Sequence, residues 1–177
     1  MSRSERALPF RLRFRERALS RWAARYDASV DTLVEAIGRR ARERGHLTAG
    51  EFRALARWKT PRSSPLIAGN DEALVAETTR VALSTHVPRL RIEILTLLRG
   101  VHWPTASVIL HFAHREGHPI LDVRALWSVG VSPVPAYTFE FWDRYVAFTR
   151  ELSRRSGLGM RDLDRALWQY SKEKQVP

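Results

Sequence analysis

The chain has 177 residues, 44% hydrophobic and 28% charged, which is enough apolar sequence for one globular domain with a core. It contains no cysteine, which excludes disulfides, thiolate catalysis and cysteine-bound zinc or iron–sulfur centres. No apolar run approaches the ~18 residues of a membrane helix, and the basic N-terminus has no apolar signal region, so we expect a cytoplasmic protein with no membrane contact.

Basic residues outnumber acidic ones by 30 to 19, and all of them are arginine except Lys59, Lys172 and Lys174. Guanidinium groups match the geometry of phosphate oxygens, and a net charge of +11 favours a polyanionic partner. We therefore expect DNA binding, with RNA as the alternative and the nucleoid as the location if DNA is bound. An unspecific basic surface is the other explanation of the same composition.

Apolar positions recur at three- and four-residue spacing along most of the chain, and no segment alternates like a strand. Capping residues or prolines mark helix starts at Thr48, Asn70, Pro88, Pro104 and Asp122. We predict an all-α multi-helix bundle, with a basic N-terminal helical segment over residues 1–45 and the main domain over 46–177. The expected helices cover residues 15–26, 31–44, 52–58, 71–84, 89–98, 105–114, 123–129, 138–155 and 160–173.

A short glycine-containing turn joins two of these helices in "LLRGVHWPTA", residues 97–106. Gly100 supplies the unusual backbone angles that such a turn needs. The helix that follows would point its unpaired N–H groups outward, where they and the helix dipole can bind a phosphate. Contacts of this kind read the backbone of a nucleic acid, so they predict binding that does not depend on base sequence.

The segment "LRGVHWPTASVIL", followed by Gly117, Pro119 and Asp122, resembles the helix-hairpin-helix motif of the DNA glycosylase superfamily that is named for this hairpin, a Gly/Pro-rich loop and an aspartate (HhH-GPD). The usual hairpin of that family reads L-P-G-V-G-x-K-T-A, and its aspartate lies in V-D-T-H-V. Residues 98–126 lie on the family pattern without a gap. The rest of the chain resembles the family only in being helical.

The resemblance implies an enzyme of base excision repair, a hydrolase that removes a damaged or modified base from DNA. Asp122 would activate water or stabilise the oxocarbenium-like sugar as the N-glycosidic bond breaks. Aspartate is also a preferred helix N-cap, and this role alone would explain Asp122. No organic cofactor is implied, although hairpin carbonyls could hold K⁺ or Na⁺. The backbone of the DNA would be anchored by Gly100, Val101, His102, Thr105 and Ala106.

Three departures from the family pattern matter. Family members that also cleave the strand carry a lysine at the position of Pro104, so a lyase step through this residue is excluded and a monofunctional glycosylase is expected. His102 replaces the second hairpin glycine, and a four-cysteine cluster found in many members is absent. The alternative is therefore a non-enzymatic DNA- or RNA-binding module of the same fold that has lost its active site. A helical protein–protein adaptor is a third possibility, but it leaves the charge unexplained.

Further candidate residues for DNA contact surround this segment. Trp103 at the turn could stack on an extruded base, and Arg124 follows the candidate aspartate. Lys59 and Arg62 lie in a basic loop and are expected to bind phosphate, with an amine nucleophile as the alternative role of Lys59. A basic stripe is either an arm along DNA or RNA or a solvated face, and it consists of Arg11, Arg13, Arg15, Arg17 and Arg21.

The remaining polar and aromatic clusters are given structural roles. The spacing of His111, His114 and His118, with Glu116 nearby, suggests zinc, but no fixed second shell is evident and we expect no metal site. Asp162 and Asp164 are expected as first-turn carboxylates of the last helix. A monomer is expected, with the base pocket between the turn and residues 49–84. Helical spacing predicts core positions for Trp58, Trp127, Trp142 and Trp168.

Overall fold

The computed structural model describes residues 10–61 and 64–175, and over these residues the chain is all-helical with no strand, as predicted. Short 3₁₀ helices at Glu16–Ala18, Ala28–Asp31 and Ile94–Leu97 accompany ten α-helices. The α-helices are α1 (Leu19–Ala23), α2 (Thr32–Arg44), α3 (Ala49–Lys59), α4 (Ser64–Ala68), α5 (Glu72–Ser84), α6 (Pro88–Glu93), α7 (Trp103–Ala113), α8 (Val123–Ser128), α9 (Phe139–Ser156) and α10 (Met160–Lys174). None of the described helices is long and apolar enough to cross a bilayer.

Local signals account for most helix boundaries. The Thr48 hydroxyl and the Glu51 carboxylate form the expected capping box at the start of α3. The predicted cap of α5 is off by one residue, because the side chain of Asp71, not Asn70, accepts the Leu74 N–H. Asn70 instead forms hydrogen bonds with the backbone of the turn before α7. The first predicted helix is also divided, into a 3₁₀ turn and α1.

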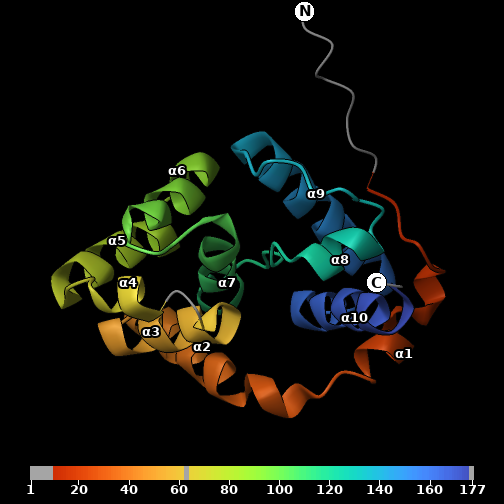
Figure 1. Cartoon of the computed structure of the whole chain (residues 1–177), viewed down its shortest axis with the longest axis horizontal. Helices are drawn as coiled ribbons and strands as arrows, with labels where there is room; N and C mark the ends of the chain where they lie inside the picture. Colours follow the sequence, from red (N-terminus) through yellow and green to blue (C-terminus); the bar gives the residue numbers. More distant parts are fainter. Residues whose placement is uncertain (1–9, 62–63, 176–177) are drawn as a thin grey trace, which may run out of the picture.

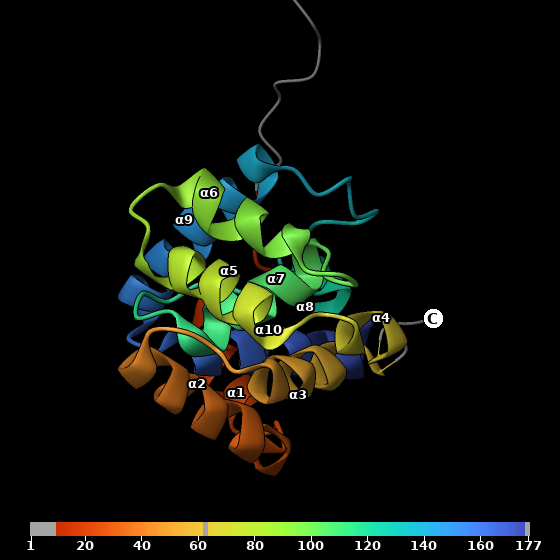
Figure 2. The ribbon, with the colours of Figure 1, turned by 90° about the vertical axis from the view of Figure 1, so that its left-hand side faces the viewer.

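The helices form two groups (Figures 1 and 2). One group contains α2 to α7, and the other contains α1, α8, α9 and α10. Helix α7 lies at the centre, where eight of its eleven residues are buried. Both α2 and α3 pack against it, while α10 packs against α8 and α1. The chain therefore starts in the second group, builds the first, and returns to the second through residues 114–122.

Residues 10–45, which the sequence sets apart as a basic segment, share one core with the rest of the described chain. Backbone hydrogen bonds tie Arg11 and Arg13 to the end of α8, at Val129 and Ser128. Side chains alternate here, with apolar residues packed inward and arginines exposed. Trp22 of α1 is buried against α10, where its ring lies 5.2 Å from that of Tyr170. The beginning of the chain is thus fastened to its last helix.

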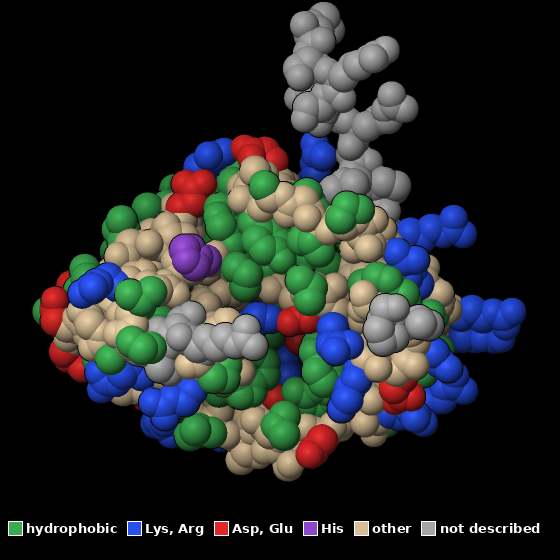
Figure 3. Space-filling view, viewed as in Figure 1, with side chains coloured by type: hydrophobic (Ala, Val, Ile, Leu, Met, Phe, Trp, Pro, Cys, Tyr) green, Lys and Arg blue, Asp and Glu red, His purple; other side chains and the backbone are tan. Residues whose placement is uncertain are grey.

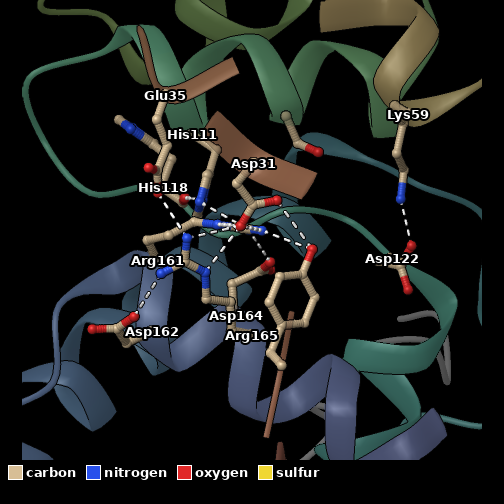
Figure 4. Close-up of polar contacts among 12 residues, drawn as sticks. Asp31, Glu35, Lys59, His111, His118, Asp122, Arg161, Asp162, Asp164 and Arg165 are labelled. Atoms are coloured by element: carbon tan, nitrogen blue, oxygen red, sulfur yellow. Dashed lines mark hydrogen bonds and ion pairs between the residues drawn. The ribbon is translucent and has the colours of Figure 1, made fainter. Parts of the chain in front are cut away.

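A network of ion pairs joins the start of α2 to α10 (Figure 4). Asp31 is completely buried, and its Oδ2 atom lies 2.7 Å from Arg161 and 2.8 Å from Arg165, both on α10. The Tyr26 hydroxyl donates a further hydrogen bond to Asp31 at 3.0 Å. Arg165 also pairs with Glu35 of α2 at 2.8 Å. Because a buried carboxylate requires this degree of compensation, the network fixes the start of α2 on α10.

Candidate functional site

A pocket of about 550 Å³ lies between the two groups of helices. Figure 3 shows a hollow at the centre of this face where acidic and basic side chains meet. The end of α3 forms one wall, α10 forms the other, and the segment that enters α8 closes the base. The lining residues are Arg25, Tyr26, Asp27, Val30, Trp58, Lys59, Ile120, Asp122, Arg161, Asp164, Trp168, Gln169 and Lys172.

Within this pocket Lys59 faces Asp122 (Figure 4). The lysine Nζ lies 2.5 Å from the aspartate Oδ2, and the two side chains are only 13% and 21% exposed. The sequence selects both residues but does not pair them. Lys59 ends α3, whose orientation is fixed by the edge-to-face contact of the Trp58 and Phe112 rings, 5.3 Å apart.

Asp122 has two roles, divided between its two carboxylate oxygens. Its Oδ1 accepts the Arg124 N–H at 2.9 Å and caps α8, as the sequence predicts. Its Oδ2 is the atom that meets Lys59 in the pocket. The capping function therefore uses only one of the two oxygens, and the other faces the pocket, where it is paired with Lys59.

A second carboxylate lies in the pocket that the sequence does not predict there. Asp164 is buried on α10 and bonds to Arg161 at 2.7 Å, whereas Asp162 is the exposed first-turn residue. Burial raises the pKa of Asp164 to about 6, against the pull of the Arg161 guanidinium, and the nearby Asp122 carboxylate adds to the rise. This group can therefore change its protonation state near neutral pH.

The aromatic walls of the pocket also differ from expectation. Trp58, predicted as a core residue, packs against the core and also lines the pocket, and Trp142 is fully buried as predicted. Trp168, also predicted as a core residue, lines the pocket. Tyr26 stands at 82° to Trp168, with ring centroids 5.5 Å apart. These rings give the pocket flat apolar surfaces of the kind on which a planar ring system can stack. Trp103 is partly buried against the core and does not line the pocket.

The turn before α7 has the geometry that its sequence predicts. Gly100 has a φ of +78°, and a side chain there would meet Leu66 and Ile67. The Asn70 carboxamide accepts the Arg99 N–H at 2.8 Å and donates to the Arg99 carbonyl at 3.0 Å, so it holds the turn on both sides. Asn70 therefore stabilises this turn and does not cap α5 as expected.

The predicted DNA-anchoring residues of the turn differ in how accessible they are. The side chain of His102 is exposed, whereas Gly100 is partly buried against Leu66 and Ile67. The side chains of Val101, Thr105 and Ala106 are buried, so they can support the turn but cannot reach a ligand. Within the described residues His102, the N-cap of α7, makes no side-chain capping bond, and Pro104 in the first turn has no N–H to donate.

The remaining predicted basic residues divide in the same way. Arg124 lies near the pocket, with its guanidinium 5.8 Å from the centre of the Trp168 ring. Arg62 falls outside the described residues. Arg15, Arg17 and Arg21, at and just before α1, line a separate hollow of about 350 Å³. None of these three forms an ion pair within residues 10–61 and 64–175, unlike Arg25 and Arg155 nearby.

Arginine side chains contact the histidine cluster that the sequence suggests as a zinc site. Ligand atoms of His114, Glu116 and His118 lie within 4.8 Å of one another, while His111 lies apart and faces Arg161. However, Arg150 lies 3.0 Å from Glu116 and 3.2 Å from the His118 Nε2, and Arg91 also reaches both residues. Two guanidinium groups therefore stand where a metal ion would have to bind, which makes the cluster a poor cation site.

Comparison of the chain with protein-family models, with curated proteins and with solved structures finds no match in any of the three. The chemistry of the site must therefore be argued from its residues. The sequence selects Lys59 and Asp122 but not Asp164, Trp168 or Arg161, because these come from a helix whose pattern indicates only an amphipathic face.

Proposed function

We propose that the protein binds DNA and hydrolyses the N-glycosidic bond of a damaged or modified base. The observation that carries this proposal is the position of Asp122, which caps α8 with one oxygen and presents the other to the pocket. A carboxylate held in this way stabilises the positive charge that develops on the sugar as the base departs. The all-helical fold and the turn at Gly100 agree with the resemblance to the glycosylase superfamily.

The shape and lining of the pocket suit a flat ring system such as a nucleobase. Its volume of about 550 Å³ is ample for an extruded base, and Trp58, Trp168 and Tyr26 offer surfaces for stacking. Asp164 and Gln169 supply hydrogen-bonding groups at the α10 wall. A nucleobase that enters between α3 and α10 would bring its sugar toward Asp122 at the bottom of the pocket.

Contact with the nucleic acid backbone is proposed at two places. The first is the turn at Gly100 and His102 at the start of α7, where within the described residues no side chain of the N-cap caps the helix. The second is the hollow formed by Arg15, Arg17 and Arg21, whose charges are not neutralised by described carboxylates. A non-enzymatic DNA- or RNA-binding module of the same fold is the second candidate, and the observation in its favour is that Lys59 already occupies the Asp122 carboxylate.

A single-turnover excision assay tests the proposal. Duplexes carrying one deaminated, oxidised or alkylated base are incubated with excess protein and treated with alkali, which breaks the strand at each abasic site. We expect cleavage of at least one duplex and its loss in Asp122→Asn, since asparagine keeps the helix cap but not the charge. Asp143→Asn, at an exposed position of α9, is the matched control. Salt-sensitive binding without excision on any duplex would favour the binding module.

A further inference from the structure

We infer that a groove along the end of α2 binds a diphosphate group, either free pyrophosphate or the diphosphate of a nucleotide. The groove consists of two adjoining hollows, of about 240 and 320 Å³, and the side chain of Arg42 lines both. Arg39 lines the first hollow and Arg115 lines the second. The inference goes beyond the proposed function, because it requires neither DNA nor the pocket that holds Asp122.

The surroundings of Arg42 are the first argument. Its side chain is half-buried, yet it meets no carboxylate in the part of the chain that the structure describes. A charge withdrawn from water without a counterion is unfavourable, because nothing replaces the lost hydration. The other arginines that are at least partly buried have such compensation. Arg124 stacks on Trp168, and the rest pair with carboxylates, namely Arg91, Arg150, Arg161 and Arg165. An anion beside Arg42 would supply the missing counterion.

Two hydrogen bonds already hold the guanidinium groups of the groove in place. Arg42 donates to the carbonyl of Phe112 in the last turn of α7, and Arg115 donates to the carbonyl of Arg42 at 3.4 Å. A guanidinium has five N–H groups, and no other described residue accepts a hydrogen bond from these two side chains. Because both side chains are fixed before a ligand arrives, less conformational entropy is lost when an anion binds.

The lining of the groove favours phosphate over other ligands. A guanidinium presents parallel N–H groups that match two oxygens of one phosphate. Two hollows that share Arg42 would hold two neighbouring phosphate groups, which is the arrangement in a diphosphate. None of the described residues that line the second hollow is aromatic, so it offers no face for a nucleobase. Arg161 also lines the first hollow, but its five N–H groups already have partners, so Arg39 and Arg42 would make the direct contacts there.

Two carboxylates also line the groove. Glu35, in the first hollow, is paired with Arg165 at 2.8 Å. Glu43 is exposed and lines the second hollow, where its charge would repel an incoming phosphate. The arginines outnumber these carboxylates, so the groove still attracts an anion. Removal of the Glu43 charge should therefore strengthen binding.

The groove lies at the other end of α7 from the turn at Gly100. That turn precedes the first residue of α7, whereas Phe112 and Ala113, which line the two hollows, are its last two. Eleven helical residues span about 16 Å along the axis. The groove is therefore separate from the backbone contacts proposed at the turn.

Calorimetric titration of the full chain tests the inference. The protein is titrated with inorganic pyrophosphate and, separately, with orthophosphate in a phosphate-free buffer of low ionic strength. We expect saturable binding of one pyrophosphate per chain and about tenfold weaker binding of orthophosphate, because a single phosphate group fills only one hollow. A nucleoside diphosphate is the third ligand. Binding as tight as that of pyrophosphate supports a nucleotide as the source of the diphosphate, and weaker binding supports free pyrophosphate.

Arg39→Gln and Arg42→Gln should each weaken pyrophosphate binding by about tenfold. Arg40→Gln is the matched control, because it removes the same charge from the same helix at a residue that pairs with Glu51 at 3.1 Å, and we expect a change below about twofold. Arg39 is exposed and forms no ion pair within the described residues, so its variant tests the site even if Arg42→Gln loses stability. Thermal unfolding checks each variant.

Glu43→Gln should tighten pyrophosphate binding by about twofold or more, whereas Glu151→Gln, on α9, should leave it unchanged. A wild-type chain without saturable binding, or equal losses in Arg39→Gln and Arg40→Gln, would overturn the inference. Displacement of pyrophosphate by an undamaged DNA duplex would also overturn it and would assign the groove to the DNA interface. The titration involves no base excision, so its result is independent of the proposed hydrolysis.

Discussion

The carbonyl oxygen of Phe112 in α7 lies where a Cβ atom on Gly38 of α2 would have to be placed. The carbonyl carbon of Phe112 would be only 2.8 Å from that Cβ, so backbone and not a movable side chain blocks the site. The same carbonyl accepts a hydrogen bond from Arg42. The two helices therefore touch at their backbones, and α7 is held closely against α2.

Gly38→Ala is expected to destabilise the protein even though alanine is the better helix former. Overpacking of this kind costs about 1–3 kcal/mol, and the helix-propensity gain of about 1 kcal/mol offsets only part of it. Gly50→Ala, in α3, is the matched control, since no atom lies closer than 3.9 Å to the added carbon and a small gain is expected. Chemical denaturation measures both. A Gly38→Ala variant as stable as Gly50→Ala would contradict the close helix contact.

The buried Asp31 network should be far more sensitive than its exposed neighbour. Asp31→Asn leaves Arg161 and Arg165 without their shared buried counterion, and we expect a loss of about 3–5 kcal/mol in the free energy of unfolding. Asp162→Asn removes a partner of the same Arg165 but on a side chain that is 51% exposed, so we expect a loss below about 1 kcal/mol. Equal losses in urea unfolding would show that burial does not govern this network.

Acid should unfold the protein partly through His118. Burial lowers the pKa of this residue to about 3, and the neighbouring His114 and Arg150 cations oppose its protonation further. The unfolded chain binds this proton below about pH 6.5 and the folded chain does not, so stability present above pH 6.5 is lost as the pH falls toward 3. Each unit of this interval costs about 1.4 kcal/mol.

His118→Gln cannot take up the proton, so its stability should decline less between pH 7 and pH 4.5, by about 3 kcal/mol relative to wild type. The difference between the two pH values is the quantity to compare, because glutamine also loses the stacking of His118 on Trp142. His86→Gln, at an exposed position, is the control. If both variants change the pH dependence equally, the buried histidine is not responsible.

The arginine hollow should determine how strongly DNA binding depends on salt. Replacing Arg15, Arg17 and Arg21 by glutamine is expected to reduce the slope of log K against log salt by about 0.9 for each phosphate contact removed. A triple variant of ion-paired arginines removes the same charge, and we expect it to change the slope much less. Its positions are Arg80, Arg89 and Arg154. Equal slopes in fluorescence titrations of the two variants would remove this hollow from the proposed interface.

The sequence predicts the features whose causes are local. The capping box at Thr48, the turn at Gly100 and the Asp122 cap each depend on a few adjacent residues, and all three appear in the structure. The pocket depends instead on which helices meet. Trp168 and Asp164 have the spacing of an ordinary amphipathic helix, and only the packing of α10 opposite the end of α3 turns them toward a common space.

The contact of Asp31 with Arg161 and Arg165 has a consequence for synthesis on the ribosome. The carboxylate is synthesised early, but its two counterions lie more than a hundred residues later in the chain. Until then the beginning of α2 has no partner for its buried charge, and Lys59 and Asp122 lack the wall that α10 provides. The pocket therefore assembles only after α10 has been synthesised, and a nascent chain that stalls before residue 160 exposes apolar surface to chaperones while holding no finished site.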